Sequence, residues 1–236
     1  MSELETLVHL QEYDSRIQSL EAEAARLPRE IDALQDRLAE ARRALETARA
    51  RLEATRKELR ARERDLDDIA VKRARSEARL YEVKTNQEYS AVLAEIEAIK
   101  AQKARTEEEI LALMERQEAL AQEVREAEAR LRAREEQVRR EEAELRRRLA
   151  AVQAELEGVR GERASLSREL PRPLLVDYER VLRARGGLAV APVTATGACG
   201  GCRVAVRPQA LVELRTGALH RCESCGRYLY WQEPAA

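Results

Sequence analysis

The sequence predicts a mostly α-helical protein, a long kinked antiparallel coiled-coil hairpin followed by a small β zinc ribbon. Three observations predict this fold: a seven-residue repeat over residues 10–83, a looser copy over residues 89–170, and four cysteines within the 27 residues 199–225. The composition agrees, because a chain with 37% charged and 3% aromatic residues and no Phe cannot fill a large globular core.

The first arm carries an unbroken alternation of three-residue and four-residue steps from Leu10 to Val83. Eighteen of its 22 positions are apolar, counting Ala and Tyr. An average spacing of 3.5 residues keeps one narrow apolar seam against a partner helix and imposes a left-handed supercoil. This arm is therefore predicted to be one strand of a coiled coil.

The second arm repeats the pattern from Tyr89 onward, and its seam changes phase near residue 145. If the chain reverses at residues 85–86, residue i lies beside residue 171−i, so Pro28 lies beside residue 143. An interior proline bends a helix. The coincidence predicts a shared kink near 28/145, and it favours an antiparallel hairpin over a parallel dimer of one long helix.

The reversal itself is predicted near residues 84–88, around Asn86, which is the only asparagine in the chain. Asparagine tolerates the left-handed conformation that ends a helix. One uninterrupted helix is the alternative, since asparagine costs a helix only a few tenths of a kcal/mol, roughly. Lys84, Asn86, Gln87 and Tyr89 exceed what a bare turn needs, so we expect the tip to contact a protein partner.

Three segments follow from these signals. Residues 1–170 form the hairpin. Residues 171–187 form a short helix and linker, because Pro171 and Pro173 stop the second arm, residues 174–185 have amphipathic helical spacing, and Gly186-Gly187 ends the helix. Residues 188–236 form the zinc-ribbon domain, which begins with a strand at 188–193.

The four cysteines stand as two Cys-x-x-Cys pairs, Cys199 with Cys202 and Cys222 with Cys225, separated by nineteen residues. This spacing is typical of one structural zinc ion held by four thiolates. An iron centre or a redox pair is the alternative. His220 is surplus to a complete ligand set and is expected to be a strand residue. A zinc ion with four protein ligands has no open position for catalysis.

Basic and aromatic residues surround the cysteines. Residues 180–236 hold eight Arg and three Glu, a net charge of +5, which leaves −6 for residues 1–179. The candidate contacts with nucleic acid or a protein partner are Arg203, Arg207, Arg215, Arg221, Arg227, Tyr228, Tyr230 and Trp231. A small ribbon also needs rings for its own core, so we expect one face of the last strand to be buried and the other to be available.

Three function classes compete: a protein adaptor, a nucleic-acid-binding protein and an enzyme. The enzyme is disfavoured, because a two-helix coiled coil has no cavity for a small-molecule substrate and the metal site is closed. No signal-peptide pattern and no membrane-spanning run occurs, which predicts a cytoplasmic protein. We therefore expect a non-enzymatic adaptor or regulator that binds protein, RNA or DNA. A pure protein scaffold is the alternative.

The segments 83–92, Ala189–Val193, Cys199–Cys202 and Cys222–Tyr230 resemble the bacterial coiled-coil proteins that carry a C-terminal four-cysteine zinc ribbon. The resemblance covers the whole chain and implies a kinked helical hairpin with the ribbon at its base. It further implies an adaptor or regulator, since such proteins bind an alternative sigma factor, secretion or flagellar export components and in some cases messenger RNA.

Overall fold

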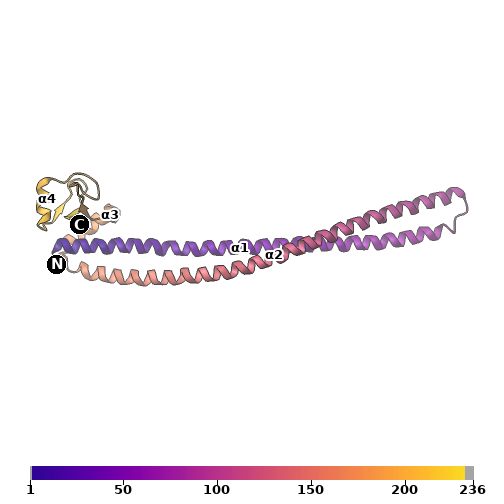
Figure 1. The fold of residues 1–236 in the computed structure, drawn as a ribbon, viewed down its shortest axis with the longest axis horizontal. Coiled ribbons are helices and arrows are strands. Elements are labelled where there is room, and N and C mark those ends of the chain that lie inside the picture. Colours follow the sequence, from indigo (N-terminus) through magenta and orange to yellow (C-terminus); the bar gives the residue numbers. More distant parts are fainter. Residues whose placement is uncertain (1, 232–236) are drawn as a thin grey trace. The chain divides into compact units, whose positions relative to one another are not determined.

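The computed structural model describes residues 2–231 and confirms the predicted fold class (Figure 1). Two long helices, α1 (Glu3–Arg79) and α2 (Asn86–Ser167), form the hairpin. The short helix α3 (Arg172–Ala184) leads into the ribbon, which consists of β1 (Val190–Val193), α4 (Pro208–Arg215), β2 (His220–Arg221) and β3 (Tyr228–Trp231). The chain divides into two compact units, residues 33–141 and residues 1–32 with 142–236.

The unit of residues 33–141 is pure hairpin, and its buried residues are those of the heptad seam. Leu45, Leu52 and Ile69 of α1 and Val92 and Ile96 of α2 are all buried. Because these side chains recur every three or four residues, they form one apolar stripe on each helix.

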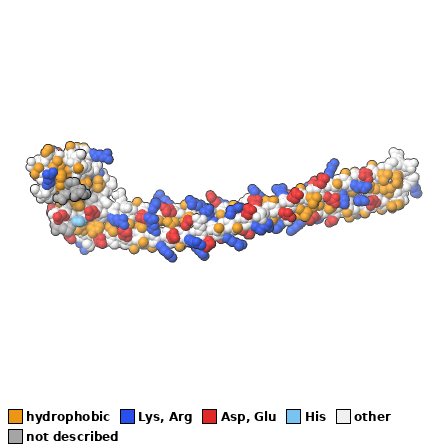
Figure 2. All heavy atoms as spheres, in the orientation of Figure 1, with side chains coloured by type: hydrophobic (Ala, Val, Ile, Leu, Met, Phe, Trp, Pro, Cys, Tyr) orange, Lys and Arg blue, Asp and Glu red, His pale blue; other side chains and the backbone are white. Residues whose placement is uncertain are grey.

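Ion pairs across this unit show that the two helices are antiparallel. Arg42 pairs with Glu135 at 3.0 Å, Arg49 with Glu128 at 2.6 Å, and Arg62 with Glu109 at 2.9 Å. The partner numbers fall as the α1 numbers rise, as the hairpin prediction requires. Each exposed pair contributes about 0–1 kcal/mol, so the pairs favour the register more than they stabilise the fold. Acidic and basic side chains alternate over the helices (Figure 2).

The reversal at the tip lies earlier than predicted. Residues 80–85 connect the helices, so Asn86 is the first residue of α2 instead of a left-handed turn residue. Among residues 2–231, Arg203 is the only non-glycine residue with a positive φ. Thr85 explains the shift, because its hydroxyl accepts the Glu88 amide at 3.2 Å while the Glu88 carboxylate accepts the Thr85 amide at 3.2 Å. This capping box fixes the start of α2.

The second unit joins the open end of the hairpin to the ribbon. Its hairpin portion has a core of Leu20, Leu27, Val152 and Leu156. Helix α1 continues through Pro28. The predicted kink near 28/145 and the predicted divisions at 170 and 187 remain predictions.

The ribbon is a three-stranded sheet in the order β1-β3-β2, with β1 parallel and β2 antiparallel to β3. Side chains alternate across β3, so its two faces enter two different cores. Tyr228 packs with Leu7, Leu10 and Tyr178 against the hairpin base, whereas Leu229 packs on the cysteine side with Leu214.

The outer edge of β1 is closed. Its register with β3 directs the backbone groups of Val190 and Pro192 away from the sheet. The Val190 amide donates to Gln11 Oε1 at 3.0 Å, the Pro192 carbonyl accepts the Gly200 amide at 2.8 Å, and proline has no amide to offer. Within residues 2–231, the Val190 carbonyl is the one backbone group of this edge without a partner, so the edge is protected from pairing with another strand.

Candidate metal centre and its surroundings

The four cysteine sulfurs converge on one point. All four Sγ atoms lie within 4.8 Å of one another, with Cys199 and Cys225 at 3.8 Å and Cys202 and Cys222 at 3.6 Å. A tetrahedral zinc ion with Zn–S bonds of about 2.3 Å separates its sulfurs by about 3.8 Å. The thiols therefore fit one structural Zn²⁺, which they would hold with no open coordination position.

Both knuckles use the same backbone turn. The Arg203 amide donates to the Cys199 carbonyl at 2.7 Å, and the Gly226 amide donates to the Cys222 carbonyl at 2.8 Å. The donor residue is left-handed in each case, with φ of 61° at Arg203 and 76° at Gly226. Glycine adopts this conformation freely, whereas an arginine there is strained by roughly 1–2 kcal/mol.

Protonation of the thiols depends on their surroundings. Burial raises the pKa of Cys199 to about 12, so this thiol needs a cation before it ionises near neutral pH. Burial acts in the same direction on Cys225, but hydrogen bonds from the amide and side chain of Arg227, together with those from the Cys202 and Cys222 thiols, outweigh it and lower the pKa of Cys225 to about 6. A bound zinc ion would supply the positive charge that four neighbouring thiolates, three of them buried, require.

Two arginines tie the second knuckle to the segment after α3. Arg185 Nε donates to the Cys225 carbonyl at 2.8 Å. Arg227 Nε donates to the Leu188 carbonyl at 2.8 Å, and its Nη2 donates to the Arg185 carbonyl at 3.2 Å. Arg227 thus has a positioning role in the ribbon, in addition to the binding role that the sequence suggested.

The other arginines predicted to bind a partner mostly have internal partners. Arg207 forms an ion pair with Glu223, and the Arg215 guanidinium lies 4.3 Å from the centre of the Trp231 ring. Arg221 pairs with Asp177 at 3.0 Å and lies over the Tyr228 ring. Arg203 is exposed and has no ionic partner among residues 2–231.

The two faces of β3 pack against different cores, and the expectation that one of them is available to a partner stays a prediction. Tyr228 is 3% exposed, and its hydroxyl donates to Asp177 at 2.5 Å. Tyr230 packs partly against the hairpin-side core, and Trp231 packs partly against the cysteine-side core. Tyr230 and Trp231 are therefore only half-buried, one against the hairpin base and the other on the side of helix α4. His220 pairs with Glu213 at 2.7 Å, which agrees with its expected place outside the ligand set.

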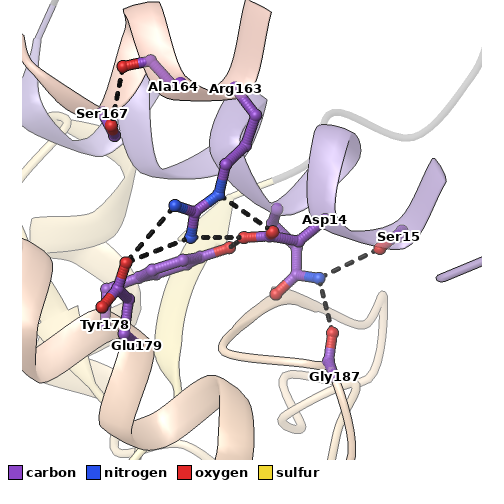
Figure 3. A network of polar contacts seen from close by, with 9 residues as sticks. Asp14, Ser15, Arg163, Ala164, Ser167, Tyr178, Glu179 and Gly187 are labelled. Carbon is purple, nitrogen blue, oxygen red and sulfur yellow. Dashed lines mark hydrogen bonds and ion pairs between the residues drawn. The ribbon is translucent and has the colours of Figure 1, made fainter. Parts of the chain in front are cut away.

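A polar network that the sequence did not reveal joins α1, α2 and α3 (Figure 3). The Asp14 carboxylate accepts a hydrogen bond from the buried Tyr178 hydroxyl at 2.7 Å and from Arg163 Nε at 3.1 Å. Arg163 also pairs with Glu179 at 3.3 Å. Burial, followed by the Asp14 charge, raises the pKa of Tyr178 far above its usual range, so the hydroxyl stays a donor.

Gln11 makes a second unforeseen link between α1 and the ribbon. Its side-chain oxygen accepts the amides of Ala189 at 2.6 Å and Val190 at 3.0 Å, and its Nε2 donates to the Gly187 carbonyl at 2.8 Å. Asp177 is a third link, where the Tyr228 hydroxyl and then Arg180 and Arg221 lower the carboxyl pKa. Gln11 directly follows Leu10, a residue of the predicted coiled-coil seam. That adjacency was the only feature of the sequence that could have indicated the link between Gln11 and the ribbon.

The predicted tip residues Lys84, Asn86, Gln87 and Tyr89 are all exposed. Tyr81, which the sequence analysis did not single out, is the most exposed large apolar residue at the tip, at 93%. No helix within residues 2–231 is both long and apolar enough to cross a membrane.

Comparisons with known proteins agree with this architecture. The CT398-like coiled-coil hairpin domain matches residues 10–187, and the C4-type zinc ribbon domain matches residues 198–229. The structure is similar to that of CT398 from Chlamydia trachomatis, with a TM-score of 0.82, 24% identity and 97% of each chain covered.

Two further solved structures share the fold. The HP0958 protein from Helicobacter pylori has a TM-score of 0.59 at 20% identity, with 98% of each chain covered. A protein from Mycobacterium smegmatis has a TM-score of 0.73 at 20% identity, with 98% of this chain and 99% of that chain covered. The search of curated proteins found no match.

Proposed function

The chain belongs to the family of proteins with a CT398-like coiled-coil hairpin domain, here followed by a C4-type zinc ribbon, and we propose that it is a non-catalytic adaptor for protein partners. The two matched family models describe a coiled-coil hairpin and a zinc ribbon, which are structural domains. In this proposal the zinc ion stabilises the ribbon, and partners bind at the ribbon and at the hairpin tip.

The internal engagement of the ribbon arginines carries this proposal. Arg207 is paired with Glu223, Arg215 is stacked on Trp231, and Arg221 is paired with Asp177. Phosphate binding at Arg215 or Arg221 would have to displace the contact with Trp231 or with Asp177, whereas the exposed Arg207–Glu223 pair opposes an incoming anion little. The buried Tyr228 offers no face for base stacking. These contacts favour a protein partner over nucleic acid.

The tip supports a second protein contact. Between Asp14 and Asp177 the only aromatic residues are Tyr81 and Tyr89. They are 93% and 46% exposed, and Leu93, one helical turn after Tyr89 on α2, is 41% exposed. Exposed rings contribute nothing to a coiled-coil core, whereas tyrosines are enriched at the energetic centres of protein interfaces.

Partner class and location follow from the resemblance and the thiols. An alternative sigma factor or a secretion component is the partner class to test first. Four free cysteines suit a reducing cytoplasm, where thiols stay available to zinc. RNA or DNA binding is the second candidate, favoured by the exposed Arg203, which has no ionic partner within residues 2–231, and by the net charge of +5 over residues 180–236.

A pull-down from native cytosol, with and without nuclease, tests the proposal. We expect a protein partner that survives nuclease and is lost with the double variant Tyr81→Ser/Tyr89→Ser. Val71→Ser is the matched control, because Val71 is 50% exposed on the arm away from the tip. Loss of every protein after nuclease treatment would contradict the proposal.

The variants Arg203→Gly and Arg203→Ala distinguish nucleic-acid binding from the binding of a protein partner. Both remove the charge, but glycine also relieves the left-handed backbone. If nucleic acid binds through Arg203, both variants weaken it equally and the salt dependence becomes shallower. A protein adaptor keeps its partner with both variants.

A further inference from the structure

The second edge of the ribbon sheet, at β2, is open, in contrast to the closed edge of β1. Arg221 faces Tyr228 in the antiparallel pair, and the Cys222 amide donates to the Arg227 carbonyl at 2.7 Å. This pattern makes Arg221 a non-hydrogen-bonded position, whose backbone amide and carbonyl point away from β3. No other backbone group of residues 2–231 bonds to them.

A second open edge faces the same space. Ala205 bridges Ala198, while the Cys199 amide donates to the Val204 carbonyl and the Val206 amide donates to the Gly197 carbonyl, at 2.9 Å and 2.8 Å. The bonds therefore flank Ala205, and its own amide and carbonyl point away from Ala198. Within the described chain they too have no backbone partner.

Between these edges lies a cavity of about 320 Å³. Its apolar lining includes Val204, Val206, Ala210 and Leu229, and Val204 is 46% exposed. The two open edges decide what fits. An extended strand offers backbone amides and carbonyls on both of its sides, whereas a helix uses these groups internally and has none to pair with Ala205 and Arg221.

We propose that this cavity, the ribbon slot, binds an extended acidic segment of a protein partner, which pairs with Arg221 on one side and Ala205 on the other. The inference rests on the proposed adaptor function and assigns one of its two contact surfaces. Main-chain pairing supplies affinity, and the apolar lining selects every second side chain.

The charges that line the slot determine which side chains the bound strand carries at the positions that do not face the apolar lining. Arg207, His220, Arg221 and Glu223 are the titratable residues that line the slot. Arg221 and His220 already pair with Asp177 and Glu213 outside the lining, so Arg207 is the cation that an incoming carboxylate can reach. The Arg207–Glu223 pair joins the two walls, and both side chains are mostly exposed. Such a pair is weak, so an incoming carboxylate replaces Glu223 at little cost. Acidic residues alternating with apolar ones therefore suit the slot.

Binding is tested on the zinc-loaded full chain with the acetylated hexapeptide Glu-Val-Glu-Val-Glu-Val. Nitrogen-15 NMR should show shifts at the Ala205 and Arg221 amides, and hydrogen exchange at both should slow. Ala210→Trp fills the slot and should weaken binding about tenfold or more. Val212→Trp is the matched control, because Val212 lies on the same helix, is 59% exposed and does not line the slot.

N-methylated peptides test the two-sided geometry. A strand between two edges uses the amides on both of its sides, so methylation of the odd or of the even amides should each weaken binding about tenfold. Tolerance of one of the two patterns would mean that only one edge binds, and it would overturn the slot. Unchanged Ala205 and Arg221 amides at millimolar peptide, or shifts there with oligothymidine alone, would overturn it as well.

The pull-down with Ala210→Trp separates this inference from the adaptor function. The slot is supported if the wild type captures a protein after nuclease treatment, Ala210→Trp abolishes this capture and Val212→Trp preserves it. Equal capture by all three chains leaves the adaptor function intact and overturns the slot. Capture that nuclease abolishes overturns both.

Discussion

Replacing Gln11 by alanine should loosen the ribbon while leaving the hairpin folded. The Gln11 oxygen is the acceptor for two amides in the buried start of β1, where Ala189 is 0% and Val190 is 1% exposed. Alanine leaves both amides without an acceptor, at about 1–3 kcal/mol each. It also removes the hydrogen bond to the Gly187 carbonyl. We expect the ribbon to lose about 3–5 kcal/mol of stability.

Two signals separate the ribbon from the hairpin during urea unfolding. Trp231 is the only tryptophan, so its fluorescence reports the ribbon, and far-ultraviolet circular dichroism reports α1 and α2. With a slope of about 1–3 kcal/mol per molar urea, the fluorescence midpoint should fall by at least about 1 M. The circular dichroism midpoint should change much less.

Gln11→Glu is a second variant for this experiment. A carboxylate still accepts the two amides, but it cannot donate to the Gly187 carbonyl and it brings a charge into a position that is 7% exposed, so Gln11→Glu should also destabilise the ribbon. A ribbon that loses less than about 1 kcal/mol in Gln11→Ala would refute the assigned role of the buried amides.

Three further predictions concern the metal, the second arm and the tip. Purified protein should contain one zinc per chain, and a chelator should melt the ribbon while helical circular dichroism stays nearly unchanged; protein without zinc would contradict the site. Gly158→Ala and Gly161→Ala should each stabilise the hairpin by about 1 kcal/mol, because an added Cβ meets nothing within 4 Å, and thermal unfolding checks the sign. Hydrogen bonds from Thr85 lower the pKa of Glu88 below 4.5. The stability that the Glu88 cap contributes is therefore present above pH 4.5 and is lost as the pH falls through the lowered pKa. Carboxyl NMR should show that Thr85→Ala raises the pKa of Glu88.

The heptad seam and the cysteine pairs made the fold predictable, because both signals are local. The seam residues Leu45 and Leu52 are buried as their spacing requires, and the two Cys-x-x-Cys pairs place their ligands within single turns. The tip was misplaced by a few residues, because the Thr85–Glu88 capping box competes with the turn preference of Asn86 and determines the helix start.

The contacts between the hairpin base and the ribbon could not be predicted. Gln11 and Gly187 are 176 positions apart in the chain, and Tyr178 and Asp14 are 164 apart. Nothing in the spacing of either residue reveals such a partner. For the same reason the ribbon arginines resembled free cations in the sequence, although Asp177, which neutralises Arg221, lies outside the ribbon.

The closed edge of β1 limits how this protein can assemble. A sheet grows into a filament only if each added strand exposes a new edge and the opposite side accepts another copy. Gln11, Pro192 and Gly200 stop growth at one side, so at most one strand can join the sheet, at β2. Concentrated protein should therefore stay free of ribbon-mediated fibres, and a partner bound at β2 should be held in a one-to-one ratio.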